Sequence, residues 1–317
     1  MKKIGIVAVS AITLCWAIYE VSSHNTNTAP RNESNQKVAS KSISSTTKNE
    51  KLAPQMLLAQ TTSLNSSAPV CKYNFDATQE DYDLFNTQYP DRPPTMKFPR
   101  INGQNFGFKI DPITEDHYGY FIYTAKSKSR MNSISYEGDF LLPHKGIVAF
   151  EMQLKIPTIS SGSSYYSSDI SFTGVTDNNY IINSFYNFII GAYDPDFGEN
   201  PPSLYYSLSS QVNEDTLIDR YHKNRNMTGN TNAYQRLGIY INQNTGQVGF
   251  ILNGLDEGYK FKLPGALQKV AFTVDGVVDI HSTNLFGQEL SNELITDRNA
   301  LQFSYPKGTT DMCGNAL

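Results

Sequence analysis

The sequence lacks the features of several large functional classes. Its 317 residues include one tryptophan, three cysteines and five histidines, and only 18% of them are charged. The 26 Lys and Arg residues are outnumbered by 30 Asp and Glu residues, so there is no excess of positive charge to bind nucleic-acid phosphates. Beyond one segment near the N-terminus, no uncharged apolar run approaches the roughly 20 residues that cross a bilayer. With 39% hydrophobic residues, the composition indicates a globular protein that does not bind nucleic acid.

Short catalytic and metal-binding motifs are absent as well. No two histidines stand at the i, i+2 or i, i+4 spacing that would pair them on one strand or helix face, so a zinc site is unsupported. Neither the Gly-x-Ser-x-Gly nucleophile elbow nor the Gly-x-x-x-x-Gly-Lys phosphate loop occurs. A catalytic triad assembled from residues far apart in the sequence stays open.

The first 23 residues have the pattern of a bacterial export signal. Met1–Lys3 carries positive charge, and the uncharged run Ile4–Tyr19 comes directly after it. Val21 and Ser23 stand at the third and first positions before a cut after Ser23. The apolar run is short for a membrane span, which favours a cleaved signal peptide over an N-terminal membrane anchor. We therefore expect an exported protein of the periplasm, cell surface or medium, which contacts the membrane only if this segment is retained.

Residues 24–70 differ sharply in composition from residues 71–317. Ser, Thr, Asn, Gln and Lys dominate the first stretch, which predicts a disordered linker. Residues 71–317 contain 19 basic and 27 acidic side chains, a balance of −8, and form the predicted folded domain. The sequence thus predicts an export segment at 1–23, a tether at 24–70 and one domain at 71–317.

The three cysteines mark the same boundary. Cys15 lies in the export segment, which leaves Cys71 and Cys313 at the two ends of the predicted domain. In an exported protein these two are expected to form a disulfide bond, and two free reactive thiols are the alternative. Closing a loop of this length removes denatured-state entropy worth on the order of 5 kcal/mol. The pairing also requires the two ends of the domain to meet.

Within the domain, apolar and polar side chains alternate with a period of two. The run Phe150–Ile156 is the clearest, because every second residue is apolar. The same alternation occurs at Ile170 and Phe172; at Val248, Phe250 and Leu252; at Tyr259, Phe261 and Leu263; at Val270, Phe272 and Val274; and at Leu301, Phe303 and Tyr305. Only Leu285–Ile295 is compatible with a short surface helix. Turn residues separate the runs, which predicts an all-β fold with two antiparallel sheets packed face to face as a jelly-roll sandwich.

Two segments resemble known families. Arg236–Asn242, together with Thr245–Gly254, resembles the late hairpin of concanavalin-A-like jelly rolls, a superfamily of lectins, laminin-G-like modules and glucanases. Cys71–Thr78 resembles the start of the mature domain in an uncharacterised family of exported Gram-negative bacterial proteins. The first resemblance implies a jelly roll that recognises or degrades glycans, and the second implies no activity.

The carboxylate motif of the glucanases is absent. The nearest spacing, Asp194, Asp196 and Glu199, is interrupted by Pro195 and Gly198 and belongs in a loop rather than on a catalytic strand. These three carboxylates could bind calcium, and the alternative is an exposed acidic loop without a metal. No other cofactor is indicated.

Aromatic and amide side chains concentrate between positions 165 and 206. Tyrosine rings can stack on sugar C–H surfaces while amides bind hydroxyl groups, and the same residues can anchor a protein contact. Alternatively, about half of these tyrosines point into the core. The candidate ligand-binding residues are Tyr165, Tyr166, Tyr180, Tyr193, Tyr205, Tyr206, Asn178 and Asn179.

Three functions fit these features. The leading hypothesis is a non-catalytic recognition domain of the bacterial cell envelope that binds a glycan, or an envelope or host surface protein, through edge loops during adhesion. The second is an exported polysaccharide hydrolase or lyase whose acidic residues are dispersed in the sequence. The third is a structural envelope or pilus component whose exposed strand edge pairs with a neighbour.

The acidic loop provides the first testable prediction. If Asp194, Asp196 and Glu199 bind calcium in the folded state only, adding calcium should raise the melting temperature. Differential scanning calorimetry with and without calcium measures the shift. An unchanged melting temperature at millimolar calcium would contradict the assignment.

Overall fold

The computed structural model describes residues 70–76, 78–80, 100–109, 119–121, 138–158, 166–190, 193–194, 198–199, 201–213, 216–228, 233–278 and 285–317. The predicted export segment, 1–23, lies outside these residues, as does the predicted linker, 24–70, except for its last residue. In the described part of the chain, no helix combines the length and apolar character needed to cross a membrane.

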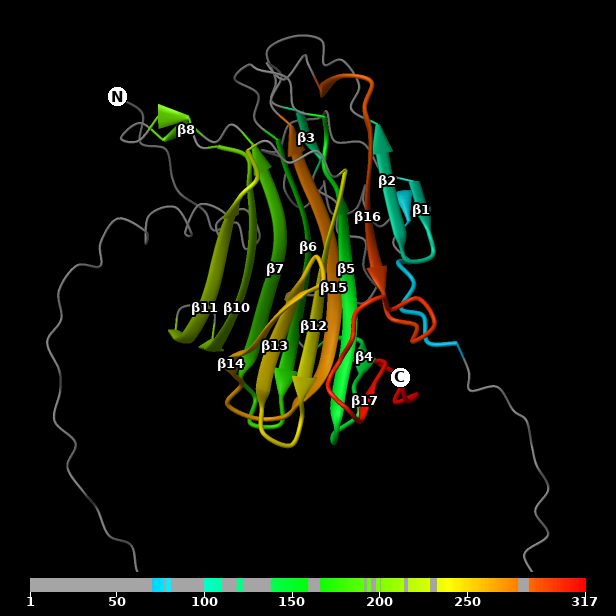
Figure 1. Ribbon diagram of the computed structural model, residues 1–317, viewed down its shortest axis with the longest axis vertical. Coiled ribbons are helices and arrows are strands. Elements are labelled where there is room, and N and C mark those ends of the chain that lie inside the picture. The colour runs from blue at the N-terminus through cyan, green and yellow to red at the C-terminus, as the bar shows by residue number, and fades with distance from the viewer. Residues whose placement is uncertain are drawn as a thin grey trace, which may run out of the picture. The chain divides into compact units, whose positions relative to one another are not determined.

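Two large β-sheets make up the described fold (Figure 1). In order across the sheet, the eight-stranded sheet contains β1 (Arg100–Asn102), β2 (Asn105–Lys109), β16 (Glu289–Ile295), β5 (Ile147–Lys155), β12 (Tyr234–Asn242), β13 (Gln247–Leu252) and β14 (Leu255–Lys262), with β17 (Thr309–Thr310) beside β5. The seven-stranded sheet contains β11 (Thr216–Asn226), β10 (Ser203–Asn213), β7 (Ile181–Ile190), β6 (Tyr166–Thr176), β15 (Leu267–Val278) and β3 (Gly119–Phe121), with β4 (Phe140–Leu141) beside β15. A separate pair joins β8 (Tyr193–Asp194) to β9 (Gly198–Glu199).

Among these strands, all pairings except that of β17 with β5 are antiparallel, so the predicted all-β, two-sheet antiparallel jelly-roll sandwich is confirmed. Figure 1 shows that the axes of the long strands in both sheets are roughly aligned, as expected for aligned sheet packing.

The core between the sheets results from the period-two alternation. Phe150 on β5 is fully buried, and its ring centre lies 5.6 Å from that of Phe172 on β6 and 5.2 Å from that of Phe272 on β15. Both contacts have the edge-to-face geometry that aromatic pairs prefer. Strands β5, β6 and β15 therefore contribute one face each to a shared core, as the alternating runs predicted.

Two expectations about local structure are wrong. Leu285–Ile295 is not a helix, because β16 occupies Glu289–Ile295 and alternates buried Leu290 and Leu294 with more exposed neighbours. The run Leu301–Tyr305 alternates apolar side chains but forms no strand. It lies instead against the outer side of the eight-stranded sheet, where Phe303 and Tyr305 pack near buried Tyr240.

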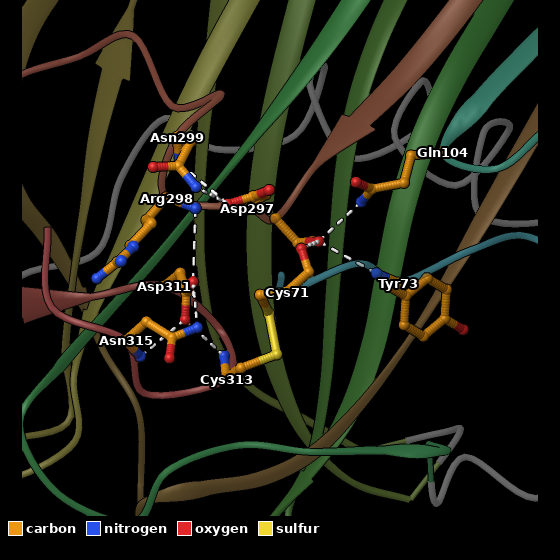
Figure 2. The surroundings of a disulfide bond; sticks show 10 residues. Cys71, Tyr73, Gln104, Asp297, Arg298, Asn299, Asp311, Cys313 and Asn315 are labelled. Atoms are coloured by element: carbon orange, nitrogen blue, oxygen red, sulfur yellow. Dashed lines mark hydrogen bonds between the residues drawn. A yellow bond between two sulfur atoms is a disulfide. The ribbon is translucent and has the colours of Figure 1, made fainter. Parts of the chain in front are cut away.

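The two ends of the domain are joined as predicted. A disulfide bond connects Cys71 with Cys313, whose Cα atoms lie 5.6 Å apart (Figure 2). Next to it, the Thr296 hydroxyl donates to the Cys71 carbonyl oxygen at 3.0 Å and accepts from the backbone N–H of Tyr73 at 3.1 Å. Asp311 accepts from the backbone N–H of Cys313 at 3.0 Å, so both cysteines sit in hydrogen-bonded backbone.

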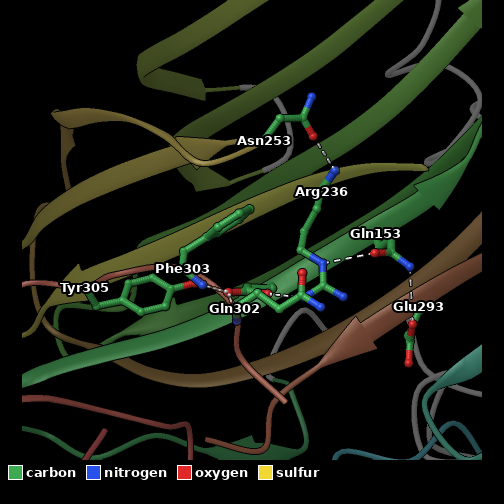
Figure 3. Close-up of polar contacts among 8 residues, drawn as sticks. Gln153, Arg236, Asn253, Glu293, Gln302, Phe303 and Tyr305 are labelled. Atoms are coloured by element: carbon green, nitrogen blue, oxygen red, sulfur yellow. Dashed lines mark hydrogen bonds and ion pairs between the residues drawn. The ribbon is translucent and has the colours of Figure 1, made fainter. Parts of the chain in front are cut away.

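The C-terminal segment is held on the outer face of the eight-stranded sheet by a buried carboxylate. Glu151 on β5 is 0% exposed, and its Oε1 accepts from the backbone N–H groups of Gln302 at 2.8 Å and Phe303 at 3.0 Å. The Tyr305 hydroxyl donates to the same oxygen at 2.9 Å, while Arg236 donates to Oε2 at 2.7 Å and to Gln153 at 3.0 Å (Figure 3). Three of the four donors to Glu151 thus come from this segment and fix it in place.

These contacts shift the pKa of Tyr305 and explain why residue 238 is a glycine. Burial and, after it, the adjacent Glu151 charge raise the pKa of the Tyr305 phenol. Gly238 on β12 lies under the segment, and a Cβ atom there would come within 2.7 Å of both the Phe303 ring and the Tyr305 hydroxyl. A residue without a side chain is therefore required at this position.

The Glu151 network predicts a large effect of a small substitution. Glu151→Gln removes one acceptor and leaves the Arg236 guanidinium, 12% exposed, without its counter-charge, so the free energy of unfolding should fall by about 3 kcal/mol. Glu289→Gln is the matched control, because its pair with Arg100 is 3.4 Å long between side chains that are 58% and 70% exposed. Its effect should stay within about 0.5 kcal/mol in urea unfolding. Equal effects of the two substitutions would contradict the structural role of Glu151.

Candidate functional site

The seven-stranded sheet has a polar face directed away from the core. Along β6, Ile170 and Phe172 are buried between the sheets, so the residues between them point to the opposite side, which we call the outer face. Most of the described outer-face positions of β6, β7 and β10 are polar: Ser167, Asp169, Ser171, Thr173, Asn183, Asn187, Ser203, Tyr205, Ser207, Ser209 and Gln211. The same register also places the apolar residues Val175, Ile181, Phe185 and Ile189 on this face.

Four outer-face residues form a line across four strands, here called the polar row. The strand register places Asp169 of β6 opposite Asn187 of β7, Asn187 opposite Tyr205 of β10, and Tyr205 opposite Asn224 of β11. Asn224 donates from Nδ2 to the Tyr205 hydroxyl at 3.0 Å, which confirms that both side chains share the outer face. Asn187 donates from Nδ2 to the Ser167 hydroxyl at 3.0 Å.

The centre of the polar row is buried, and one of its atoms lacks a partner. Asp169 is 2% exposed and Asn187 is 6% exposed, although both lie on the face away from the core. Within the described residues, the Oδ1 atom of Asn187 accepts no hydrogen bond. A buried acceptor without a partner costs about 1–3 kcal/mol, which a hydroxyl group of a ligand would recover.

Some neighbouring side chains on this face are hydrogen-bonded to one another, whereas the buried Thr173 hydroxyl has no partner among the described residues. The hydroxyls of Ser171 on β6 and Thr273 on β15 form a hydrogen bond. Asn183 on β7 donates a hydrogen bond to Gln211 on β10 at 3.2 Å. Burial raises the pKa of the partly buried Tyr205 phenol, which therefore stays neutral as both donor and acceptor. The polar part of the face is thus a set of neutral hydrogen-bonding groups with the Asp169 carboxyl at one end of the polar row.

Strand β11 is fixed against the other sheet at the edge of the sandwich. The Tyr221 hydroxyl donates to Glu257 of β14 at 3.2 Å, and Lys223 forms an ion pair with the same carboxylate. Burial acts to raise the pKa of Glu257, but hydrogen bonds led by that from Lys223 outweigh it and hold this pKa below its ordinary value. Because Tyr221 and Lys223 point inward, the alternate β11 residues, including Asn224, belong to the outer face.

The structure separates the tyrosines that the sequence grouped together. Tyr205 belongs to the polar row, whereas Tyr166 and Tyr206 lie on the core side of their strands and are 0% and 1% exposed. Adjacent residues of one strand point to opposite faces, so Tyr205 and Tyr206 cannot share a surface. Tyr206 packs its ring centre 5.3 Å from that of Phe250 in the core. The interpretation of Tyr166 and Tyr206 as surface anchors is therefore wrong.

The other predicted residues lie elsewhere. Asn178 and Asn179 are exposed in the turn between β6 and β7, and Tyr180 comes next in the chain. This turn is about eight strand residues, or roughly 27 Å, from Asp169, so these residues are not part of the polar row. Tyr193 pairs with Glu199 and Asp194 pairs with Gly198 in the β8–β9 hairpin. Tyr165 and Asp196 lie outside the described residues.

Asp169, Asn187 and Asn224 were not predicted from the sequence. A signal for Asp169 was present, since Ser167, Asp169 and Ser171 alternate with the apolar residues Ile170 and Phe172. No sequence signal aligned the three residues, because strand register brings them together. For metals, Cys71, Asp311 and Cys313 approach within 4.8 Å in the described part of the chain, but the two sulfurs are bonded to each other and offer no thiolate.

The placement of neighbouring tyrosines on opposite faces can be tested by stability. Tyr206→Ala should lower the free energy of unfolding by about 3–5 kcal/mol, because it opens a cavity in the core. Tyr205→Ala on the outer face should cost about 1 kcal/mol or less. Urea unfolding monitored by fluorescence measures both values. A larger loss for Tyr205→Ala than for Tyr206→Ala would contradict the assignment of the two faces.

Similarities to solved structures cover part of the chain. The chain is 8% identical to porphyranase B from Zobellia galactanivorans over 64% of this chain and 82% of that chain, with a TM-score of 0.37. It is 9% identical to a glycoside hydrolase family 16 endo-glucanase from Bacteroides ovatus over 64% and 89% of the two chains, with a TM-score of 0.33. For Xenopus laevis galectin-Ib the identity is 15%, the coverage 44% and 91%, and the TM-score 0.27.

Among curated proteins no match to the chain is found. Residues 49–315, which make up most of the sequence and include the whole polar row and both disulfide-bonded cysteines, match a family described as a domain of unknown function, DUF4882. The chain belongs to the DUF4882 family.

Proposed function

We propose that the polar row on the outer face of the seven-stranded sheet binds a glycan and that the protein is a recognition module. The observation that carries this proposal is the buried Oδ1 atom of Asn187, which accepts no hydrogen bond from the described residues. It lies between the Asp169 carboxyl and the Tyr205 side chain in the strand register. Sugar hydroxyls donate to amide and carboxylate oxygens, and sugar C–H faces stack on tyrosine rings.

The chemistry of the face favours a polyhydroxyl ligand over a protein. Protein-binding hot spots are usually Trp, Tyr and Arg side chains in a largely apolar centre. Here Ser, Thr and Asn side chains outnumber the apolar outer-face residues such as Phe185 and Ile189. Ser167, Asn183 and Ser209 are each less than 5% exposed. A ligand with many small hydrogen-bonding groups fits such a surface, whereas a flat protein surface would leave its recessed polar atoms unpaired.

The proposed site differs from the one expected at the sandwich edge. The loop residues Tyr180, Asn178 and Asn179 extend the proposal only for a ligand long enough to reach the β6–β7 turn. The disulfide bond supports an oxidising compartment, and export to the cell envelope with a use in adhesion is part of the proposal.

One observation favours a second candidate, an exported polysaccharide hydrolase. Asp275 on β15 is the register partner of Asp169 on β6. Glycoside hydrolysis uses a pair of Asp or Glu residues, and this register places two acidic positions on neighbouring strands. The two acidic positions are 106 residues apart in the sequence, consistent with dispersed acids.

A binding experiment tests the proposal. The full chain is screened against immobilised neutral and acidic oligosaccharides, and the strongest ligand is measured by titration calorimetry. Tyr205→Ala should weaken binding about tenfold, because a stacked ring and a hydroxyl are lost. Tyr234→Ala is the control, since Tyr234 is 52% exposed but lies on the eight-stranded sheet, and it should leave the affinity unchanged.

Three outcomes decide between the candidates. Binding by the wild type that Tyr205→Ala weakens and Tyr234→Ala does not supports a recognition module. Release of reducing ends from the bound oligosaccharide, lost in Asp169→Asn, would replace it with the hydrolase. Absence of binding across the panel, or equal losses in the two tyrosine variants, would overturn the glycan proposal.

A further inference from the structure

Two basic residues border the polar row on strand β11. The register places Arg220 opposite Ser209 and His222 opposite Ser207, and both serines belong to the outer face. The contacts of the neighbouring residues confirm this orientation, because Tyr221 packs inward with its ring centre 5.3 Å from that of Phe250, while Asn224 reaches Tyr205. Arg220 and His222 therefore extend the outer face beyond Asn224, along the edge of the sheet.

The guanidinium of Arg220 differs from three basic groups of the domain that face a carboxylate. Arg236 faces Glu151, Arg100 faces Glu289 and Lys223 faces Glu257. Arg220 is partly buried, yet among the described residues its guanidinium has neither an ion pair nor a hydrogen bond, and only its backbone N–H is bonded, to Asp219 at 2.8 Å. An arginine carries five N–H donors in a planar fork that matches carboxylate and sulfate oxygens.

Charges of opposite sign lie at different places on this face. Three inter-strand spacings, roughly 14 Å in all, separate β11 from β6. Arg220 and His222 are also displaced by four and two residues along β11 from Asn224, which is in line with Asp169. Because the Coulomb interaction falls with distance, Asp169 repels an anion bound at β11 less than it would repel one bound beside it on β6. The remaining described outer-face cation is Lys269 on β15. Strand β15 lies on the side of β6 that is away from β11.

We infer that the site takes an acidic glycan, with a carboxylate or sulfate group bound by Arg220 and the neighbouring neutral hydroxyls bound by the polar row. This inference rests on the proposed function and names the class of glycan. His222 lies two residues further along β11 and contributes a second donor to the same anionic group. The chain of sugars would then cross the strands from β11 towards β6.

The alternative explanation of the basic residues is edge protection. Charged side chains on an edge strand discourage pairing with another chain, and β11 is an edge strand among the described residues. Arg225 separates the two explanations, because it is exposed on the same strand but lies opposite the buried core residue Leu204 rather than an outer-face serine. Edge protection predicts that Arg220 and Arg225 are equivalent, whereas ligand binding does not.

The experiment compares Arg220→Gln with Arg225→Gln in the full chain. Affinities are measured by titration calorimetry for an oligogalacturonate, a sulfated galactan oligosaccharide and a neutral cello-oligosaccharide of equal length. The wild type should bind at least one acidic ligand about tenfold more tightly than the neutral one. Arg220→Gln should remove that preference, and Arg225→Gln should retain it. The two acidic ligands distinguish a carboxylate from a sulfate as the bound group.

Several results would overturn the inference. Equal affinity of the wild type for acidic and neutral ligands would remove the acidic class while leaving glycan binding intact. Equal losses in Arg220→Gln and Arg225→Gln would show a general charge effect rather than a site. Absence of binding to every glycan would overturn the proposed function itself, and the inference with it. Melting temperatures of both variants within about 2 °C of the wild type show that the comparison is made on folded protein.

Discussion

The register of β6, β7, β10 and β11 is the constraint on which the candidate site depends. A slip of one residue would move every side chain of a strand to the other face. The buried side chains of Phe172, Tyr186 and Leu208 hold the three central strands in place, since each would be exposed to the outer face after such a slip. The same packing aligns Asp169 with Asn187, although both residues lie on the face away from the core.

The two sheets use their outer faces differently. On the eight-stranded sheet, the C-terminal segment covers the face and Glu151 is surrounded by four donors, so this buried polar group is fully used for stability. On the seven-stranded sheet, Asn187 has a buried oxygen without a partner in the described chain. Buried polar groups are usually satisfied, so an unpaired atom on the face directed away from the core marks a place where a group of a ligand could bind. This contrast is the reason to place binding on the seven-stranded sheet.

The sequence was sufficient for the features that depend on local pattern. The alternation at Phe150–Ile156 predicted β5, and the two terminal cysteines predicted the disulfide bond. It failed where partners far apart in the chain decide the outcome. Leu301–Tyr305 alternates like a strand, but its backbone N–H groups at Gln302 and Phe303 donate to Glu151, more than 150 residues earlier.

The site shows the same dependence on distant partners. Which face of β10 is turned towards the core decides that Tyr206 is buried there and that Tyr205 is not. Residue type alone therefore identified one of the four members of the polar row.

A buried polar row also sets how selective binding can be. The Asn187 amide and the Asp169 carboxyl are already desolvated, so an apolar ligand gives them little, because it offers no hydrogen-bond partner. A site built to pair with a hydroxyl rejects an analogue that lacks it far more strongly than an apolar pocket rejects a missing methylene. Selectivity for glycans on this face would thus come from the recessed Asn187 and Asp169, while the more accessible Tyr205 ring would contribute affinity that varies little among sugars.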